Sequence, residues 1–98
     1  MKVIIIEDEP LVCEYLVSLI AKLSMKLEIV ATLDTVTSAV QWFKEKQAPD
    51  LAFMDIRLAD GLSFEIFERC VVPCPVIFTT AYDEYAVKAF KVTASTIY

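Results

Sequence analysis

Three carboxylates follow two apolar runs of the sequence, and together they could hold a metal ion and accept a chemical group. Glu7 and Asp8 come directly after residues 3–6, and Asp55 comes directly after residues 51–54. Both runs lack hydrophobic alternation, which is typical of strands buried on both faces of a sheet. Carboxylates brought together repel one another, and a hard divalent cation such as Mg2+ relieves that repulsion.

Such a cluster suits phosphoryl transfer, because the cation offsets charge on the moving group while one carboxylate attacks as the nucleophile. Glu7 and Asp8 are adjacent, as metal-holding pairs are, whereas Asp55 stands alone at the end of its run. We therefore expect Asp55 to be the nucleophile. For each acid taken singly, the alternative is a solvated carboxylate at a strand end.

Helices are expected between the apolar runs, where apolar residues recur at helical spacing. One helix should begin at Pro10, whose missing N–H costs nothing there, and the next should be capped by Asp34 or Thr35. A short third helix is expected over residues 62–70 and a fourth over residues 82–90.

Further strands are expected at residues 27–33 and 75–79, with a partial fifth strand within residues 92–98. Strands that alternate with helices predict an α/β fold, a three-layer αβα sandwich around a parallel sheet. In a flavodoxin-like order, 2-1-3-4-5, the first strand lies beside the third, so that their terminal acids converge at the carboxyl edge of the sheet.

Thr79 and Thr80 end the predicted fourth strand, where a hydroxyl could reach a phosphoryl group on Asp55. Thr80 is the better candidate because it lies last, at the rim. A threonine at a strand end is more often a simple β-former, so spacing alone leaves both interpretations open.

Composition excludes several other classes of function. The 98 residues fit one domain, and 14 acids against nine bases leave no basic stripe for nucleic acid. The single glycine, Gly61, excludes glycine-rich nucleotide loops, and the lack of histidine argues against zinc binding by the three cysteines. No apolar stretch could span a membrane and no secretory signal is visible, so we expect a cytoplasmic protein.

Three segments closely resemble response-regulator receiver domains, and the resemblance covers nearly the whole chain. They are residues 3–10 (VIIIEDEP), residues 53–58 (FMDIRL) with the following Asp60 and Gly61, and residues 75–86 (PVIFTTAYDEYA). Residues 75–92 look most like receivers fused to LytTR-type DNA-binding domains.

The resemblance implies a role for each matching acid. Asp8 would bind Mg2+ directly, Glu7 would act mainly through water, and the backbone carbonyl of Arg57 would complete the metal site. Asp55 would be the phosphoacceptor and a further metal ligand. The phosphoryl group would come from a phosphohistidine on a separate sensor histidine kinase, so the domain would be a signalling module and not an enzyme.

The resemblance also implies an output mechanism. Thr80 would be the switch hydroxyl, and Ala81 would be the small residue that leaves room for the phosphoryl group. Phosphorylation would draw Thr80 inward and change the surface around the fourth helix and fifth strand, near Tyr82, Tyr85 and Phe90. Simple core packing is the alternative for Tyr85 and Phe90.

The sequence departs from the family pattern near its end. The lysine that would pair with the phosphoryl group is missing, since neither Lys88 nor Lys91 matches its position, and the fifth helix is absent. We therefore expect residues 1–98 to be a receiver domain that is incomplete at its C terminus, with DNA reached only through an output domain outside this chain. The uncovered apolar face would favour a homodimer.

Two other functions remain open. One is a pseudo-receiver, a phosphate-independent interaction or dimerisation module, which the missing lysine makes credible. The other is a Mg2+-dependent phosphohydrolase with an aspartyl phosphate. Such enzymes need a second acid two residues after the nucleophile, where this chain has Arg57.

Overall fold

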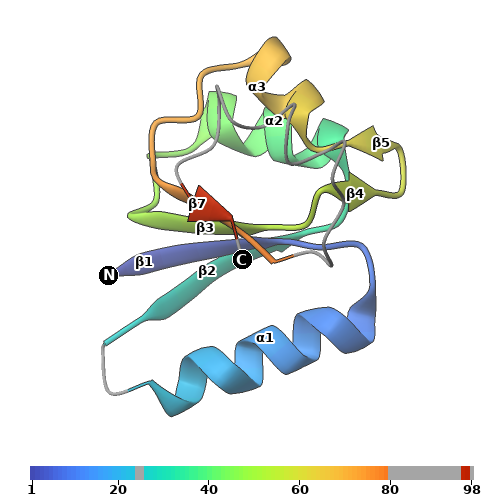
Figure 1. The fold of residues 1–98 in the computed structure, drawn as a ribbon. Helices are drawn as coiled ribbons and strands as arrows, with labels where there is room; N and C mark the ends of the chain where they lie inside the picture. Colours follow the sequence, from blue (N-terminus) through green and yellow to red (C-terminus); the bar gives the residue numbers. More distant parts are fainter. Residues whose placement is uncertain (24–25, 80–95, 98) are drawn as a thin grey trace.

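The computed structural model describes residues 1–23, 26–79 and 96–97, in which helices and strands alternate along most of the chain (Figure 1). Residues 80–95, which contain the predicted fourth helix, lie outside this part. The elements in order are β1 (Lys2–Ile6), α1 (Pro10–Lys22), β2 (Glu28–Leu33), α2 (Val36–Glu45), β3 (Leu51–Met54), β4 (Arg57–Leu58), β5 (Gly61–Leu62), α3 (Phe64–Arg69), β6 (Val76–Phe78) and β7 (Thr96–Ile97).

Five strands form one parallel sheet in the order β2-β1-β3-β6-β7. This is the predicted flavodoxin-like order, in which β6 and β7 are the fourth strand and the partial fifth strand. The central strand β1 consists of β-branched residues, and its last four side chains are fully buried. Burial on both faces is the reason that its sequence does not alternate.

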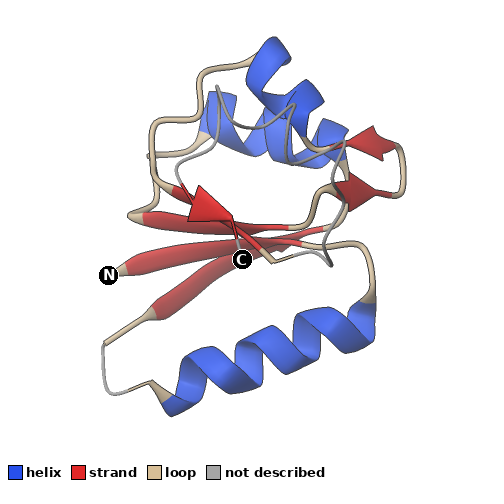
Figure 2. Cartoon of the chain, in the orientation of Figure 1, coloured by secondary structure: helices blue, strands red, loops and turns tan. Residues whose placement is uncertain are grey.

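The helices cover both faces of the sheet and complete the three layers (Figure 2). Helices α2 and α3 lie on one face, and α1 lies on the other. Helix α2 buries Val36, Ala39, Val40 and Phe43 against the sheet, as its helical spacing predicts. Of the two predicted caps, Thr35 is the N-cap: its side chain accepts a hydrogen bond from the Ser38 N–H.

Helix α1 begins at Pro10 as predicted, but it leaves much of its apolar surface exposed. Ile20 is its one buried residue, whereas Leu11, Tyr15 and Leu19 are exposed. A largely apolar cavity of about 510 Å³ lies along this side of the sheet, lined among others by Leu16 of α1 and by residues of β3 and β6. Within the described ranges, α1 is the only helix on this face, and no described helix is long and apolar enough to cross a bilayer.

The third helix is shorter than predicted. Residues Arg57–Leu58 and Gly61–Leu62 pair as a small antiparallel hairpin, so Leu62 belongs to β5 and the helix begins only at Phe64. Gly61 has a φ of 147°, a conformation that side-chain-bearing residues rarely adopt. A Cβ atom there would also collide with the Glu65 carboxylate. The glycine is therefore required by the hairpin.

The pairing between β1 and β2 contains one irregularity. Val3 lies opposite Ile29, but Ile4 lies opposite Ala31, so Val30 is left without a partner in the ladder. Strand β2 is an edge strand of the sheet, which places this β-bulge at the margin of the molecule.

Candidate functional site

The parallel pairing of β1 and β3 brings their terminal acids together. Ile6 lies opposite Met54 in this pairing, so the next residues along the two strands are Glu7 and Asp55. The Asp55 N–H donates a hydrogen bond of 2.9 Å to the carbonyl of Ile6, which extends the pairing to the first residue beyond β3. The two carboxylates therefore lie at the same edge of the sheet, as the predicted strand order requires.

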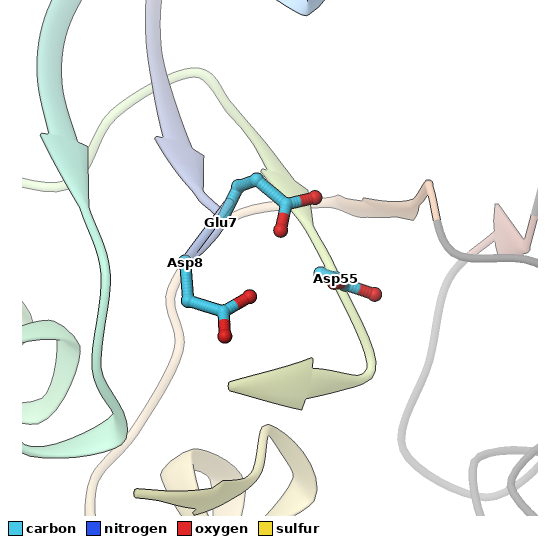
Figure 3. Close-up of side chains that lie close together, drawn as sticks. All are labelled: Glu7, Asp8 and Asp55. Carbon is cyan, nitrogen blue, oxygen red and sulfur yellow. The ribbon is translucent and has the colours of Figure 1, made fainter. Parts of the chain in front are cut away.

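Glu7, Asp8 and Asp55 form a compact acidic cluster (Figure 3). One ligand atom from each residue lies within 4.8 Å of the others. Glu7 is 6% exposed, and Asp8 and Asp55 are half-buried. The structure thus brings together all three acids that the sequence predicts at this site.

The cluster is electrostatically strained when no cation is bound. Burial raises the pKa of Glu7 from its ordinary 4.5 to about 8, and the negative charge of Asp55 adds to the increase. A hydrogen bond of 3.2 Å from the Glu9 N–H to Glu7 Oε2 opposes the shift only in part. Glu7 therefore holds a proton at neutral pH in the cation-free protein.

The donor set fits a hard divalent cation. Asp55 Oδ1 is buried and has no hydrogen-bond partner within the described residues, so an oxygen ligand is available inside the cluster. Closely spaced carboxylate oxygens are the ligands that Mg2+ prefers, and a cation there would replace the proton on Glu7. Arg57, whose carbonyl is a further predicted ligand, begins β4 two residues after Asp55.

The predicted switch residues Thr80 and Ala81 lie outside the described residues. The neighbouring Thr79 is described: its N–H donates a hydrogen bond of 3.0 Å to the Met54 carbonyl, which continues the β3–β6 pairing. Its buried hydroxyl has no partner in the described ranges, and Thr79 borders the apolar cavity beside α1. The backbone of Thr79 therefore serves the sheet, and the choice of Thr80 as the switch residue stays a prediction.

The three cysteines offer no competing chemistry. All are free, and burial raises the pKa of each thiol, to about 11 for Cys74. For Cys13, which lines a cavity next to Glu7 and Asp8, the negative charge of Glu7 adds to the shift. Thiols with raised pKa values are poor nucleophiles, so they behave as small apolar residues.

Sequence reasoning gave Asp60 no role beyond its place in a motif, yet it connects the site to α2. Its carboxylate accepts hydrogen bonds from the N–H groups of Val36, at 2.6 Å, and Thr37, at 3.1 Å. The Thr37 hydroxyl donates a third bond of 3.1 Å. Desolvation at the contact with α2 opposes the shift, but these bonds lower the pKa of Asp60. Since its partners are more than 20 residues away, no local pattern could reveal this contact.

The fold and the acidic cluster together define an α/β domain with three converging carboxylates at the carboxyl edge of its sheet, and comparison with known proteins gives the family. Residues 3–97 match the response regulator receiver domain. The chain belongs to this family, and it is the receiver domain of a two-component response regulator.

Similar proteins agree with this assignment. The chain is 40% identical to the sensory transduction protein LytT of Enterococcus faecalis over 97 residues, which cover 96% of this chain and 39% of that protein. It is 32% identical to the transcriptional regulatory protein LytR of Staphylococcus aureus, with 97% and 39% covered. The chain thus spans about two fifths of the length of these relatives.

The fold is also that of solved receiver structures. The response regulatory domain of protein mrkE from Klebsiella pneumoniae superimposes with a TM-score of 0.77 and 32% identity, covering 99% of this chain and 80% of that one. The response regulator domain of Thermotoga maritima CheB, at 17% identity and a TM-score of 0.76, shares the fold. The predicted family is therefore confirmed.

Proposed function

We propose that this domain accepts a phosphoryl group on Asp55 from a sensor histidine kinase in the cytoplasm, with Mg2+ bound at the acidic cluster. The observation that carries the proposal is the convergence of Glu7, Asp8 and Asp55 within 4.8 Å at the carboxyl ends of two central strands. In this proposal Asp8, Asp55 and the carbonyl of Arg57 ligate the cation, and Glu7 acts mainly through water.

The chemistry is a simple displacement at phosphorus. A carboxylate oxygen of Asp55 forms a bond to phosphorus while the bond between phosphorus and the donor nitrogen breaks, and the released imidazole takes up a proton. Bound Mg2+ would offset the negative charge of the transferring group and of the three carboxylates. The hydroxyl of Thr80 then donates a hydrogen bond to a phosphoryl oxygen, and Ala81 leaves space for the phosphoryl group.

The proposed output is a change in the surface around the predicted fourth helix and fifth strand, which a DNA-binding domain elsewhere in a longer protein would read. The similarity to LytT and LytR, proteins described as sensory transduction and transcriptional regulatory proteins, supports such an output. DNA binding would then belong to the output domain and not to this acidic chain of net charge −5.

The test is phosphorylation by a small donor. Wild-type protein incubated with Mg2+ and acetyl phosphate should gain the mass of one phosphoryl group, and Asp55→Asn should not. Asp50→Asn is the matched control. Asp50 directly precedes β3 and Asp55 directly follows it, so the two residues lie at opposite ends of the same strand. No mass increase in the wild type would favour a phosphate-independent module instead.

A further inference from the structure

The hairpin that follows Asp55 is fixed at both of its ends. At its base, the Ser63 N–H donates a hydrogen bond of 2.8 Å to the carbonyl of Ile56, next to Asp55. Between base and tip, Arg57 pairs with Leu62 and Leu58 with Gly61. The tip is the turn that contains Asp60, and its carboxylate binds the N terminus of α2.

Together with the chain between them, these contacts close a ring of hydrogen bonds that passes through the backbone of Glu7 and Asp55. The Asp55 N–H binds the carbonyl of Ile6, and the Glu7 N–H binds the carbonyl of Leu33 at 2.8 Å. The chain then runs from Leu33 through a short turn to α2, whose first N–H groups bind Asp60. Among the described residues, the segments that follow β1, β2 and β3 are thereby linked. The link between the segments after β2 and β3 is the Asp60 side chain.

Arg57 is part of this ring. Arg57 lies between the fixed base of the hairpin and the Asp60 tip, only three residues away. A metal ligand that is a backbone carbonyl has no rotamer to adjust, so its place depends entirely on how its loop is held. Groups that orient metal ligands in this way commonly change metal affinity when they are removed.

We infer that Asp60 is a positioning residue for the cation: it fixes the hairpin on α2 and so holds the Arg57 carbonyl toward the acidic cluster. This inference rests on the proposed function, since it takes the Mg2+ site as its starting point. Asp60 does not touch the cation itself. It acts through the backbone of the β4–β5 hairpin.

The test measures the dissociation constant for Mg2+ by isothermal titration calorimetry, together with the Mg2+ concentration that gives half the maximal rate of phosphorylation by acetyl phosphate. Asp60→Ala should raise both about tenfold, as the loss of a ligand-orienting group does elsewhere. The rate at saturating Mg2+ should stay close to that of the wild type, because Asp55 is untouched. Asp60→Asn keeps one acceptor oxygen, so its values for both measurements should lie between those of the wild type and those of Asp60→Ala.

Asp50→Ala is the control for a merely structural effect. Asp50 also binds a backbone N–H through its carboxylate, that of Lys2 at 2.6 Å, but at the other end of the sheet. The Asp50→Ala variant should have a lower unfolding midpoint in urea, with an unchanged dissociation constant for Mg2+ and an unchanged Mg2+ dependence of the phosphorylation rate. Since Thr37 is exposed, water can reach its N–H in Asp60→Ala, whereas the N–H of the buried Val36 loses its partner. That variant should therefore be less stable than the wild type, but it should fold. If it does not, Asp60→Asn decides the question.

The outcomes separate the two proposals. The positioning role alone is overturned if the wild type is phosphorylated but folded Asp60→Ala has the wild-type dissociation constant for Mg2+. If only Asp60→Asn folds, the same comparison is made with that variant. A wild-type domain that neither binds Mg2+ nor becomes phosphorylated overturns the proposed function and this inference with it. A selective rise in the dissociation constant for the Asp60 variants, absent in Asp50→Ala, supports the inference.

Discussion

In cation-free protein, the buried Glu7 carboxyl should make stability fall as the pH rises through neutrality. Its pKa is about 8 in the folded protein and 4.5 ordinarily, so the folded state binds the proton more tightly than the unfolded state does. The stabilisation is complete below about pH 4.5 and is lost as the pH rises through about 8. Each pKa unit corresponds to about 1.4 kcal/mol, which sets an upper limit of about 5 kcal/mol for the loss.

Glu7→Gln isolates this effect, because the amide resembles the protonated acid at every pH. Urea unfolding followed by circular dichroism, with a chelator present, should show equal stability of wild type and variant near pH 4, where the carboxyl is protonated in both states. Near pH 8 the variant should be more stable by a few kcal/mol, on the order of the limit above. Glu45→Gln, the same change at an exposed position of α2, should leave the wild-type pH dependence intact.

Two results would refute this reasoning. One is a wild-type free energy of unfolding that stays constant or rises across the same pH range without a cation. The other is a free energy of unfolding that falls with pH as steeply in Glu7→Gln as in the wild type. Conversely, Mg2+ should stabilise the wild type more at the alkaline end of the range than at the acidic end, because it replaces the Glu7 proton.

Three further predictions concern the scaffold. Thr35→Ala should lower the free energy of unfolding by about 1 kcal/mol, because it removes the N-cap of α2; unchanged urea denaturation would contradict that cap. Gly61→Ala should cost about 1–3 kcal/mol, since it forces an unfavourable φ and a clash with Glu65, and combining it with Glu65→Ala should recover part of the loss. The exposed apolar face beside α1 should cause self-association in light scattering at tens of micromolar, and a stable monomer there would exclude it.

The strand order and the acidic cluster were predictable because their signals are strong and local. Continuous apolar runs that end abruptly in acids identify buried strands, and parallel pairing then places Glu7 beside Asp55 without further information. The family resemblance adds the roles of individual residues. It reaches Thr80 and Ala81, which lie outside the described residues, so their roles stay predictions.

Other predictions were wrong, and some features could not be predicted, for physical reasons. Leu62 and Ile66 are four residues apart, which imitates a helical face, but Gly61 and the hairpin pairing hold Leu62 in a strand. Helical spacing located α1 correctly, yet periodicity cannot say what covers an apolar face, and most of this one is exposed. The Asp60 contact joins segments distant in sequence, so only the folded chain reveals it.

The β-bulge at Val30 affects how copies of this domain can meet. A regular outer strand offers an unpaired row of N–H and C=O groups on which another chain can build. Skipping one residue in β2 breaks that row and increases the local twist, which makes this margin a poor template for intermolecular pairing. Aggregation by sheet extension is therefore disfavoured on the β2 side. Contacts through the exposed apolar face beside α1 become the more accessible route to assembly.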